Sequence, residues 1–176
     1  MYNLRELEKK DIEQINNWRK NEDLIKYLEA PYRYINLDVE NKWYENYLNN
    51  RNTTVRCAIT TEDDNIIGLI TLADINSVSR SAVLHIMIGN EENCGKGIGS
   101  FAIKQMLNHA FLNLNLNRVE LEVLSQNIRA KKTYEKIGFK YEGTRREACF
   151  KNGNYIDIDI MSMLKKEFLT CEGESR

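Results

Sequence analysis

Proline is almost missing from this chain, and cysteine is scarce. A single proline, Pro31, occurs in 176 residues, and such a composition argues against a disordered or low-complexity protein. The four cysteines lie far apart and form no Cys-x-x-Cys pair, so the common spacings of zinc sites and disulfide scaffolds are excluded. We therefore expect reduced thiols, a cytoplasmic location and no bound metal.

The sequence also lacks a long apolar run and an excess of charge of either sign. It begins with polar residues instead of an apolar signal segment, and no stretch approaches the length of a membrane span. Lys and Arg number 25 against 26 Asp and Glu, so the net charge of -1 gives no general attraction to nucleic acid or to an anionic membrane. We expect neither of these partners.

Hydrophobic periodicity divides the chain into strands and helices of one α/β domain over residues 1–169, followed by a polar tail at 170–176. Apolar stripes predict helices over residues 11–20, 37–48, 100–112 and 127–137. Asp11 and Asn127 are expected N-caps, and Gly138 is expected to end its helix in the left-handed conformation. Alternating and β-branched runs predict strands over residues 4–7, 54–60, 66–73, 82–88, 119–124, 139–146 and 155–163.

A glycine-bearing loop joins the predicted strand at 82–88 to the helix that follows it. It reads Asn93-Cys94-Gly95-Lys96-Gly97-Ile98-Gly99-Ser100. Alternate glycines let a ligand approach the backbone, and the next helix offers unpaired N–H groups and the positive end of its dipole. Both features suit a pyrophosphate. The spacing fits neither a Walker loop nor a dinucleotide fingerprint, and a glycine-rich turn without a ligand is the alternative.

With its flanks, this loop resembles the coenzyme A signature of the GNAT acetyltransferase superfamily. Residues 127–139 are similar to that family's second segment, N-x-x-A-x-x-x-Y-x-x-x-G-F. The resemblance covers about residues 4–168 and is greatest for the bacterial branch of ribosomal-protein N-terminal and spermidine acetyltransferases. It implies a mostly antiparallel, splayed sheet of six to seven strands with about four helices. It also implies transfer of an acetyl group from acetyl-CoA to a primary amine by direct attack in a ternary complex.

The resemblance assigns roles to residues on the cofactor side. Pyrophosphate binding is expected from Gly95, Lys96, Gly97, Ile98, Gly99 and Ser100. The backbone of Ile86, Met87 and Ile88 is expected to bind the pantetheine arm and the acetyl oxygen. Asn127 is expected to bind pantetheine or the loop. Tyr134 is expected to protonate the coenzyme A sulfur, because a phenol keeps its proton near neutral pH; core packing is the alternative for this tyrosine.

Two positions depart from the family pattern. Cys94 stands where Gln or Arg is usual, but pyrophosphate contact there is mainly through the backbone, so we expect binding to be retained. Val83 stands where many relatives place the glutamate that deprotonates the amine, and valine takes no proton. His85 shares that strand face and is one catalytic candidate. A chain of waters and an amine already neutral in solution are the other routes, which we favour because strand histidines are usually structural.

On the acceptor side, the resemblance implies that residues 21–37 line the site. Glu29 and Tyr32 are expected to contact the acceptor, and Arg33 is expected to disfavour a polycation. The acceptor stays open among a protein N-terminus, a polyamine, an amino sugar and another small amine. A coenzyme A-binding sensor or scaffold that has lost catalysis is the alternative function, supported by Val83. The oligomeric state is also open, with a homodimer and a larger homo-oligomer among the options.

Overall fold

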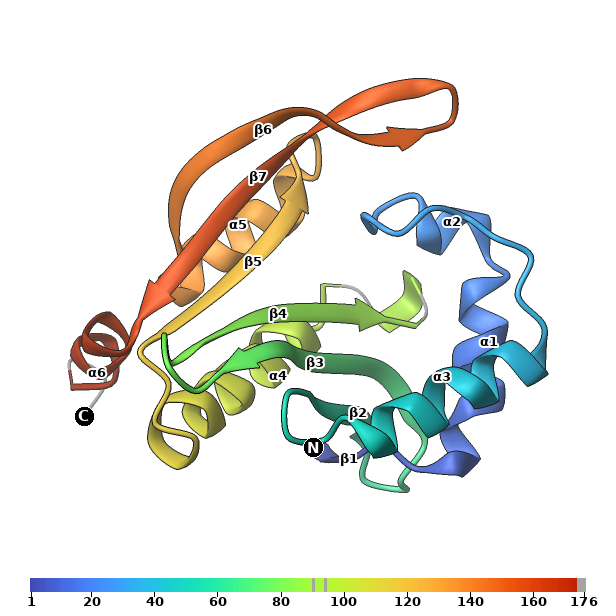
Figure 1. Ribbon diagram of the computed structural model, residues 1–176, viewed down its shortest axis with the longest axis horizontal. Coiled ribbons are helices and arrows are strands. Elements are labelled where there is room, and N and C mark those ends of the chain that lie inside the picture. Colours follow the sequence, from blue (N-terminus) through green and yellow to red (C-terminus); the bar gives the residue numbers. More distant parts are fainter. Residues whose placement is uncertain (90, 94, 174–176) are drawn as a thin grey trace.

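The computed structural model describes residues 1–89, 91–93 and 95–173, so Cys94 lies outside the described part (Figure 1). Seven strands form one sheet in the order β1-β2-β3-β4-β5-β7-β6. Neighbouring strands are antiparallel except β4 and β5, which run parallel. This arrangement confirms the predicted mixed, mostly antiparallel sheet. The strands are β1 (Tyr2–Glu6), β2 (Val55–Thr61), β3 (Ile66–Asn76), β4 (Ser81–Ile88), β5 (Arg118–Leu124), β6 (Lys140–Lys151) and β7 (Asn154–Leu164).

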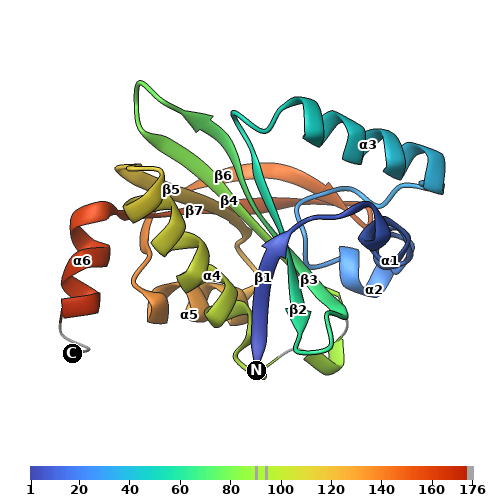
Figure 2. The same ribbon diagram turned by 90° about the horizontal axis from the view of Figure 1, so that it is seen from below.

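Helices cover both faces of the sheet (Figure 2). One face carries α4 (Ile98–Asn108) with its π-helical extension His109–Asn113, and α5 (Ile128–Ile137). The other face carries α1 (Ile12–Arg19) and α3 (Leu37–Asn49). Within the described residues, no helix is both long and apolar enough to cross a membrane. The remaining helical segments are Lys9–Asp11, α2 (Glu22–Ile25), Glu91–Asn93 and α6 (Lys165–Gly173).

Each face has its own hydrophobic core. Apolar side chains of alternate positions on β2 to β5 pack against α4 and α5, around residues such as Leu107, Phe111 and Leu121. The intervening positions face α1 and α3, and the buried residues of that core include Ile15, Trp18, Tyr47, Leu69 and Met87. The sheet is therefore apolar on both sides wherever helices cover it.

Asp11 occupies the predicted N-cap position of α1, but its side chain makes no capping hydrogen bond to that helix. Its backbone is helical, and it ends the short segment Lys9–Asp11. Its buried carboxylate accepts hydrogen bonds from the Glu8 amide at 2.9 Å and from the Arg5 guanidinium at 2.7 and 2.8 Å. A partner on β1 therefore determines the position of this side chain, and the local helix pattern does not reveal that partner.

Two of the six α-helices in the described part of the chain were not predicted. α2 has four residues, too few for hydrophobic periodicity, and is capped by the Asn21 side chain, which accepts from the amides of Asp23 and Leu24. α6 extends to Gly173, into the polar tail that was predicted at 170–176. It is held by Phe168, whose ring packs 5.3 Å from that of Phe111. Tertiary packing, more than local propensity, supports both segments.

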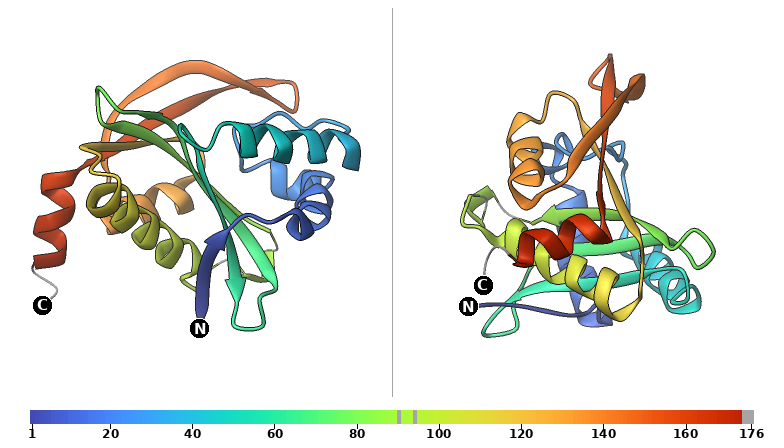
Figure 3. Two further views of the ribbon diagram at one scale, coloured as in Figure 1. Left: turned by 60° about the horizontal axis from the view of Figure 1, so that its bottom comes forward. Right: turned by 90° about the vertical axis from the view of Figure 1, so that its left-hand side faces the viewer.

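The last two strands form a long hairpin around Asn152 and Gly153. Asn152 and Gly153 both have positive φ, 50° and 81°, as a two-residue type I′ turn requires. Lys151 and Asn154 are paired across it. The strands are longer than predicted, and the hairpin tip lies beside α2 (Figure 3). The turn therefore places Lys151 at the far end of the sheet.

Gly89, directly after β4, lies against the buried ring of Trp18. A Cβ at Gly89 would come within 2.0 Å of that ring, so this position requires close backbone approach. The contact fixes the end of β4, where the glycine loop begins, against α1.

We expect Gly89→Ala to lower the free energy of unfolding by about 1–3 kcal/mol, because the added methyl group must displace the Trp18 ring. Urea unfolding followed by tryptophan fluorescence measures this change. Gly143→Ala is the matched control, since a Cβ there meets nothing within 4 Å. Equal unfolding midpoints for the two variants would contradict the role assigned to the Gly89 contact.

Candidate active site

β4 and β5 are paired through three residues only, Ser81, Ala82 and Val83. Beyond Val83 the strands diverge, and residues 84–88 of β4 pair with β3 alone in the described ladder. The β4 edge that faces β5 thus carries backbone groups without a strand partner at Ile86, Met87 and Ile88. Such an edge can hydrogen-bond an extended ligand in the manner of an added strand. The sheet is therefore splayed between β4 and β5, as the resemblance implied.

The glycine loop leads from this split into α4. Gly95 and Gly97 both have φ of 81°, in the left-handed region that favours glycine. Gly97 is the N-cap residue of α4, and no side chain caps the first turn. The Arg129 guanidinium of α5 lies 3.7 Å from where a Cβ of Gly95 would stand. Free helix amides beside a guanidinium suit a pyrophosphate, so the loop fits the predicted cofactor.

α5 provides Asn127 and Tyr134. Asn127 is the N-cap, as predicted, and accepts from the Ala130 amide at 3.2 Å. Its Nδ2 donates to the Tyr27 carbonyl at 3.4 Å, which ties α5 to the segment after α2. Tyr134 is partly buried beside the Phe139 ring. Burial and the charge of Glu29 raise the pKa of Tyr134 to about 12, so this phenol keeps its proton at neutral pH.

Two carboxylates meet near Tyr134: that of Glu29, in the segment after α2, and that of Glu122, on β5. Glu29 Oε1 is buried and has no hydrogen-bond partner among the described residues. Burial and the proximity and charge of Glu122 raise the pKa of Glu29 to about 7, against the opposing charges of Arg145 and Lys151. Glu29 therefore accepts and releases a proton near neutral pH.

The segment that carries Glu29 is held by the tip of the β6–β7 hairpin. The Lys151 side chain is buried, and its ammonium donates to the carbonyls of Ile25 at 2.9 Å and Ala30 at 2.8 Å. The Cys149 thiol donates to the Glu29 carbonyl at 3.4 Å. Desolvation lowers the pKa of Lys151, so the ammonium depends on these contacts. We call residues 25–30 the acceptor loop. Lys151 binds a carbonyl at each end of this loop.

His85 and Tyr32 occupy different surroundings. His85 projects from the same face of β4 as Val83, and its side chain is exposed. Desolvation by the surrounding protein lowers the pKa of the His85 imidazole. The charges of Asp74 and Glu122 partly offset this effect. The Tyr32 ring packs against the core beneath α1 and lies 5.6 Å from the Tyr34 ring. Catalysis by His85 and acceptor contact by Tyr32 both stay predictions.

Sequence reasoning missed Glu122, Arg145 and Lys151. Glu122 belongs to an alternating strand whose acids look like an ordinary solvated face, although the valine at 83 was a reason to search the adjacent strand for a carboxylate. Arg145 forms an ion pair with Glu122. Nothing in the local sequence indicates that Lys151 is buried. In the described part of the chain, no group of three or more His, Cys, Asp or Glu is arranged to hold a metal ion.

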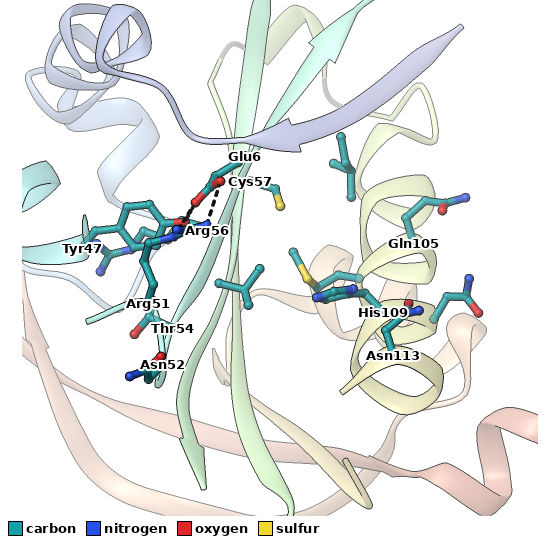
Figure 4. Close-up of a pocket in the computed structure, with 14 residues that line it drawn as sticks. Glu6, Tyr47, Arg51, Asn52, Thr54, Arg56, Cys57, Gln105, His109 and Asn113 are labelled. Carbon is teal, nitrogen blue, oxygen red and sulfur yellow. Dashed lines mark hydrogen bonds and ion pairs between the residues drawn. The ribbon is translucent and has the colours of Figure 1, made fainter. Parts of the chain in front are cut away.

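A separate hollow of about 700 Å³ lies at the other end of α4, where that helix faces β1 and β2 (Figure 4). Its polar lining includes Glu6, which accepts from Tyr47 at 2.7 Å and pairs with Arg51 at 2.9 Å. His109 lines the opposite wall. The residues predicted for the active site do not line this hollow.

Comparison with known proteins gives a consistent result. Residues 2–140 match the family model described as acetyltransferase (GNAT) domain. The chain is 34% identical over 167 residues to the spermidine N(1)-acetyltransferase of Vibrio cholerae, covering 94% of each. It is 30% identical over 171 residues to the Escherichia coli K12 enzyme of that name, covering 94% of this chain and 87% of the relative. A crystal structure of the V. cholerae spermidine N-acetyltransferase with CoA and spermine matches with a TM-score of 0.89 at 33% identity, covering 96% of this chain and 98% of that one.

We expect Lys151→Met to loosen the acceptor loop, because the carbonyls of Ile25 and Ala30 lose their donor. Unsatisfied buried carbonyls should reduce the local stability by about 1–3 kcal/mol. Amide hydrogen exchange of residues 25–30 measures this loss of protection. Lys104→Met, on the exposed face of α4, is the control. Unchanged exchange in the Lys151 variant would show that other contacts hold the loop.

Proposed function

The chain belongs to the GNAT acetyltransferase family and transfers an acetyl group from acetyl-CoA to an amine, and we propose that the acceptor is a polyamine. The observation that carries this proposal is the buried Glu29 Oε1, which lacks a donor beside a second carboxylate. The N–H groups of a cationic amine would supply that donor. Relatives at 34% and 30% identity are spermidine acetyltransferases, and the family favours an enzyme over a coenzyme A sensor.

Arg33 was expected to disfavour a polycation, and its surroundings reduce the weight of that argument. The Arg33 side chain is exposed, so water and salt screen its charge. Glu29 and Glu122 are partly buried, where the same charge acts more strongly on a ligand. The carboxylates should therefore outweigh Arg33 in acceptor binding.

The described residues support separate roles in the acetyl transfer. Gly95, Gly97 and the first turn of α4 would bind the pyrophosphate, with Lys96, Ile98, Gly99 and Ser100 contributing to the same loop. The unpaired β4 edge at Ile86–Ile88 would hydrogen-bond the pantetheine arm, with Asn127 on the opposite side. Tyr134 would donate a proton to the departing sulfur, because its hydroxyl stays protonated and makes no hydrogen bond to another described residue.

An amine that also carries a carboxylate is the second candidate acceptor, and Arg56 favours it. The Arg56 guanidinium lies 4.2 Å from the centre of the Trp43 ring and 5.3 Å from that of Tyr47. It makes no ion pair with a described carboxylate, and burial lowers its pKa. Its strand position aligns with His85 across β3, so it points to the same face of the sheet. An amino acid or a peptide could use this charge.

An amine panel separates these acceptors. We expect kcat/KM for spermidine to exceed that for a free amino acid, a peptide N-terminus and glucosamine by at least about tenfold, because only the polyamine brings several ammonium groups to the carboxylates. Release of coenzyme A, measured with a thiol reagent, gives the rates. A preference for the amino acid or the peptide, lost in Arg56→Met, would reject the polyamine and support the second candidate.

We expect Tyr134→Phe to lower kcat by about 10²-fold or more, with little change in acetyl-CoA affinity, because a general acid contributes on the order of 10²–10⁴. Steady-state rates and calorimetric titration with acetyl-CoA measure the two quantities. Tyr155→Phe, at an exposed position of the hairpin, is the control. If chemistry is rate-limiting and the Tyr134 variant keeps nearly full kcat, the acid role is rejected and this tyrosine only packs in the core.

A further inference from the structure

The acceptor amine must lose a proton before its nitrogen can attack. A polyamine is protonated near neutral pH, so the site needs a group that takes this proton. On the β4 face toward α1 and α3, Val83 has no titratable atom, and the His85 side chain is exposed. The partly buried carboxylates of the acceptor loop and β5, Glu29 and Glu122, are therefore further candidates for this role.

We propose that the carboxylate of Glu29, paired with that of Glu122, removes the proton from the acceptor amine. This inference rests on the proposed acetyl transfer and assigns a residue to the role of its general base. Glu29 Oε1 is the buried atom left without a donor, so it is the oxygen positioned to receive an N–H. Tyr134, the proposed acid, lies close enough to feel the charge of Glu29. Asn127, at the start of α5, donates to the Tyr27 carbonyl, so the acceptor loop lies beside the helix that carries Tyr134.

The position of Glu29 is fixed by contacts on both sides of the residue. Lys151 holds the carbonyls of Ile25 and Ala30, and the Cys149 thiol holds that of Glu29 itself. The loop backbone is thereby held against β6 on both sides of Glu29. A base must be held within hydrogen-bonding reach of the proton that it takes, and this anchoring provides that restraint.

Titratable and charged groups from three elements act on this pair. Arg145 and Lys151 of β6 favour its ionised form, and Tyr134 of α5 stays neutral beside it. His85 of β4 lies within electrostatic range of Glu122. Burial and the neighbouring carboxylate outweigh the two cations and raise the pKa of Glu29 to about 7. The group is therefore basic enough to accept a proton and is largely ionised just above neutral pH.

The proposed transfer conserves atoms and charge. Glu29 takes one proton from the ammonium, and the neutral nitrogen forms the C–N bond to the acetyl carbon. The C–S bond then breaks, and Tyr134 protonates the leaving sulfur. The second proton of the attacking nitrogen restores the Tyr134 phenol, and the Glu29 carboxyl releases its proton to water. The products are the acetylated amine, free coenzyme A and one proton.

The test compares pH profiles of kcat/KM for the wild type, Glu29→Gln, Glu122→Gln and His85→Gln, with spermidine and with the less basic ethylenediamine. In the wild type, kcat/KM should rise with pH through about 7, because the base must be ionised. Glu29→Gln should lose about 10²-fold or more in kcat. Glu122→Gln removes the negative charge beside Glu29 and so lowers its pKa. The rise of kcat/KM with pH should therefore move to lower pH. His85→Gln should keep the wild-type limb.

The outcomes separate this inference from the acceptor proposal. Absence of wild-type turnover with spermidine rejects the polyamine, and the profiles are then measured with the amine that the panel selects. A limb that follows the pKa of the acceptor, or that disappears in His85→Gln, overturns the carboxylate base. So does a Glu29→Gln enzyme with nearly full kcat. Circular dichroism and acetyl-CoA calorimetry verify that each variant is folded, and Glu122→Gln keeps the proposal testable should Glu29→Gln not fold.

Discussion

β4 and β5 hydrogen-bond through three residues and then separate, and the active site is arranged around that separation. On the β4 side it leaves a backbone edge and the glycine loop that precedes α4. On the β5 side it leaves Glu122, with Tyr134 on the helix that follows. The two halves carry complementary chemistry, because one offers hydrogen-bond donors to an anion and the other carries the acid and the carboxylates. The acceptor loop then spans from the first helices to the C-terminal hairpin.

The sequence was sufficient where function depends on local geometry. Alternate glycines, the Asn127 cap and the Asn152-Gly153 turn are each determined by backbone dihedrals that a few neighbouring residues specify. It was insufficient where a contact joins distant segments. The Glu29–Glu122 pair and the Lys151 contacts depend on how the sheet brings both ends of the chain together, and neither residue has a distinctive neighbourhood. For the same reason the sequence did not reveal that the Asp11 side chain binds Arg5 on another element instead of capping α1.

The electrostatics of the site work against the stability of the fold. A carboxyl whose pKa is raised in the folded state binds protons more tightly there than in the unfolded chain. Glu29 therefore reduces stability as pH rises from its usual pKa towards about 7, and the reduction persists above that pH. Arg145 and Lys151 limit this effect without abolishing it. The conflict is typical of sites where a group is kept reactive by its surroundings.

The lysine that fastens the acceptor loop has a consequence for how the protein is made. Lys151 follows its partners Ile25 and Ala30 by 126 and 121 residues along the chain. During synthesis from the N-terminus, α1, α3 and the first four strands leave the ribosome long before the hairpin. The carbonyls of the acceptor loop therefore lack the Lys151 donor until nearly the whole chain has been synthesised. A truncated or stalled product would retain the glycine loop and lack an ordered acceptor side, so that the nascent protein acquires its two substrate-binding halves in a fixed temporal order.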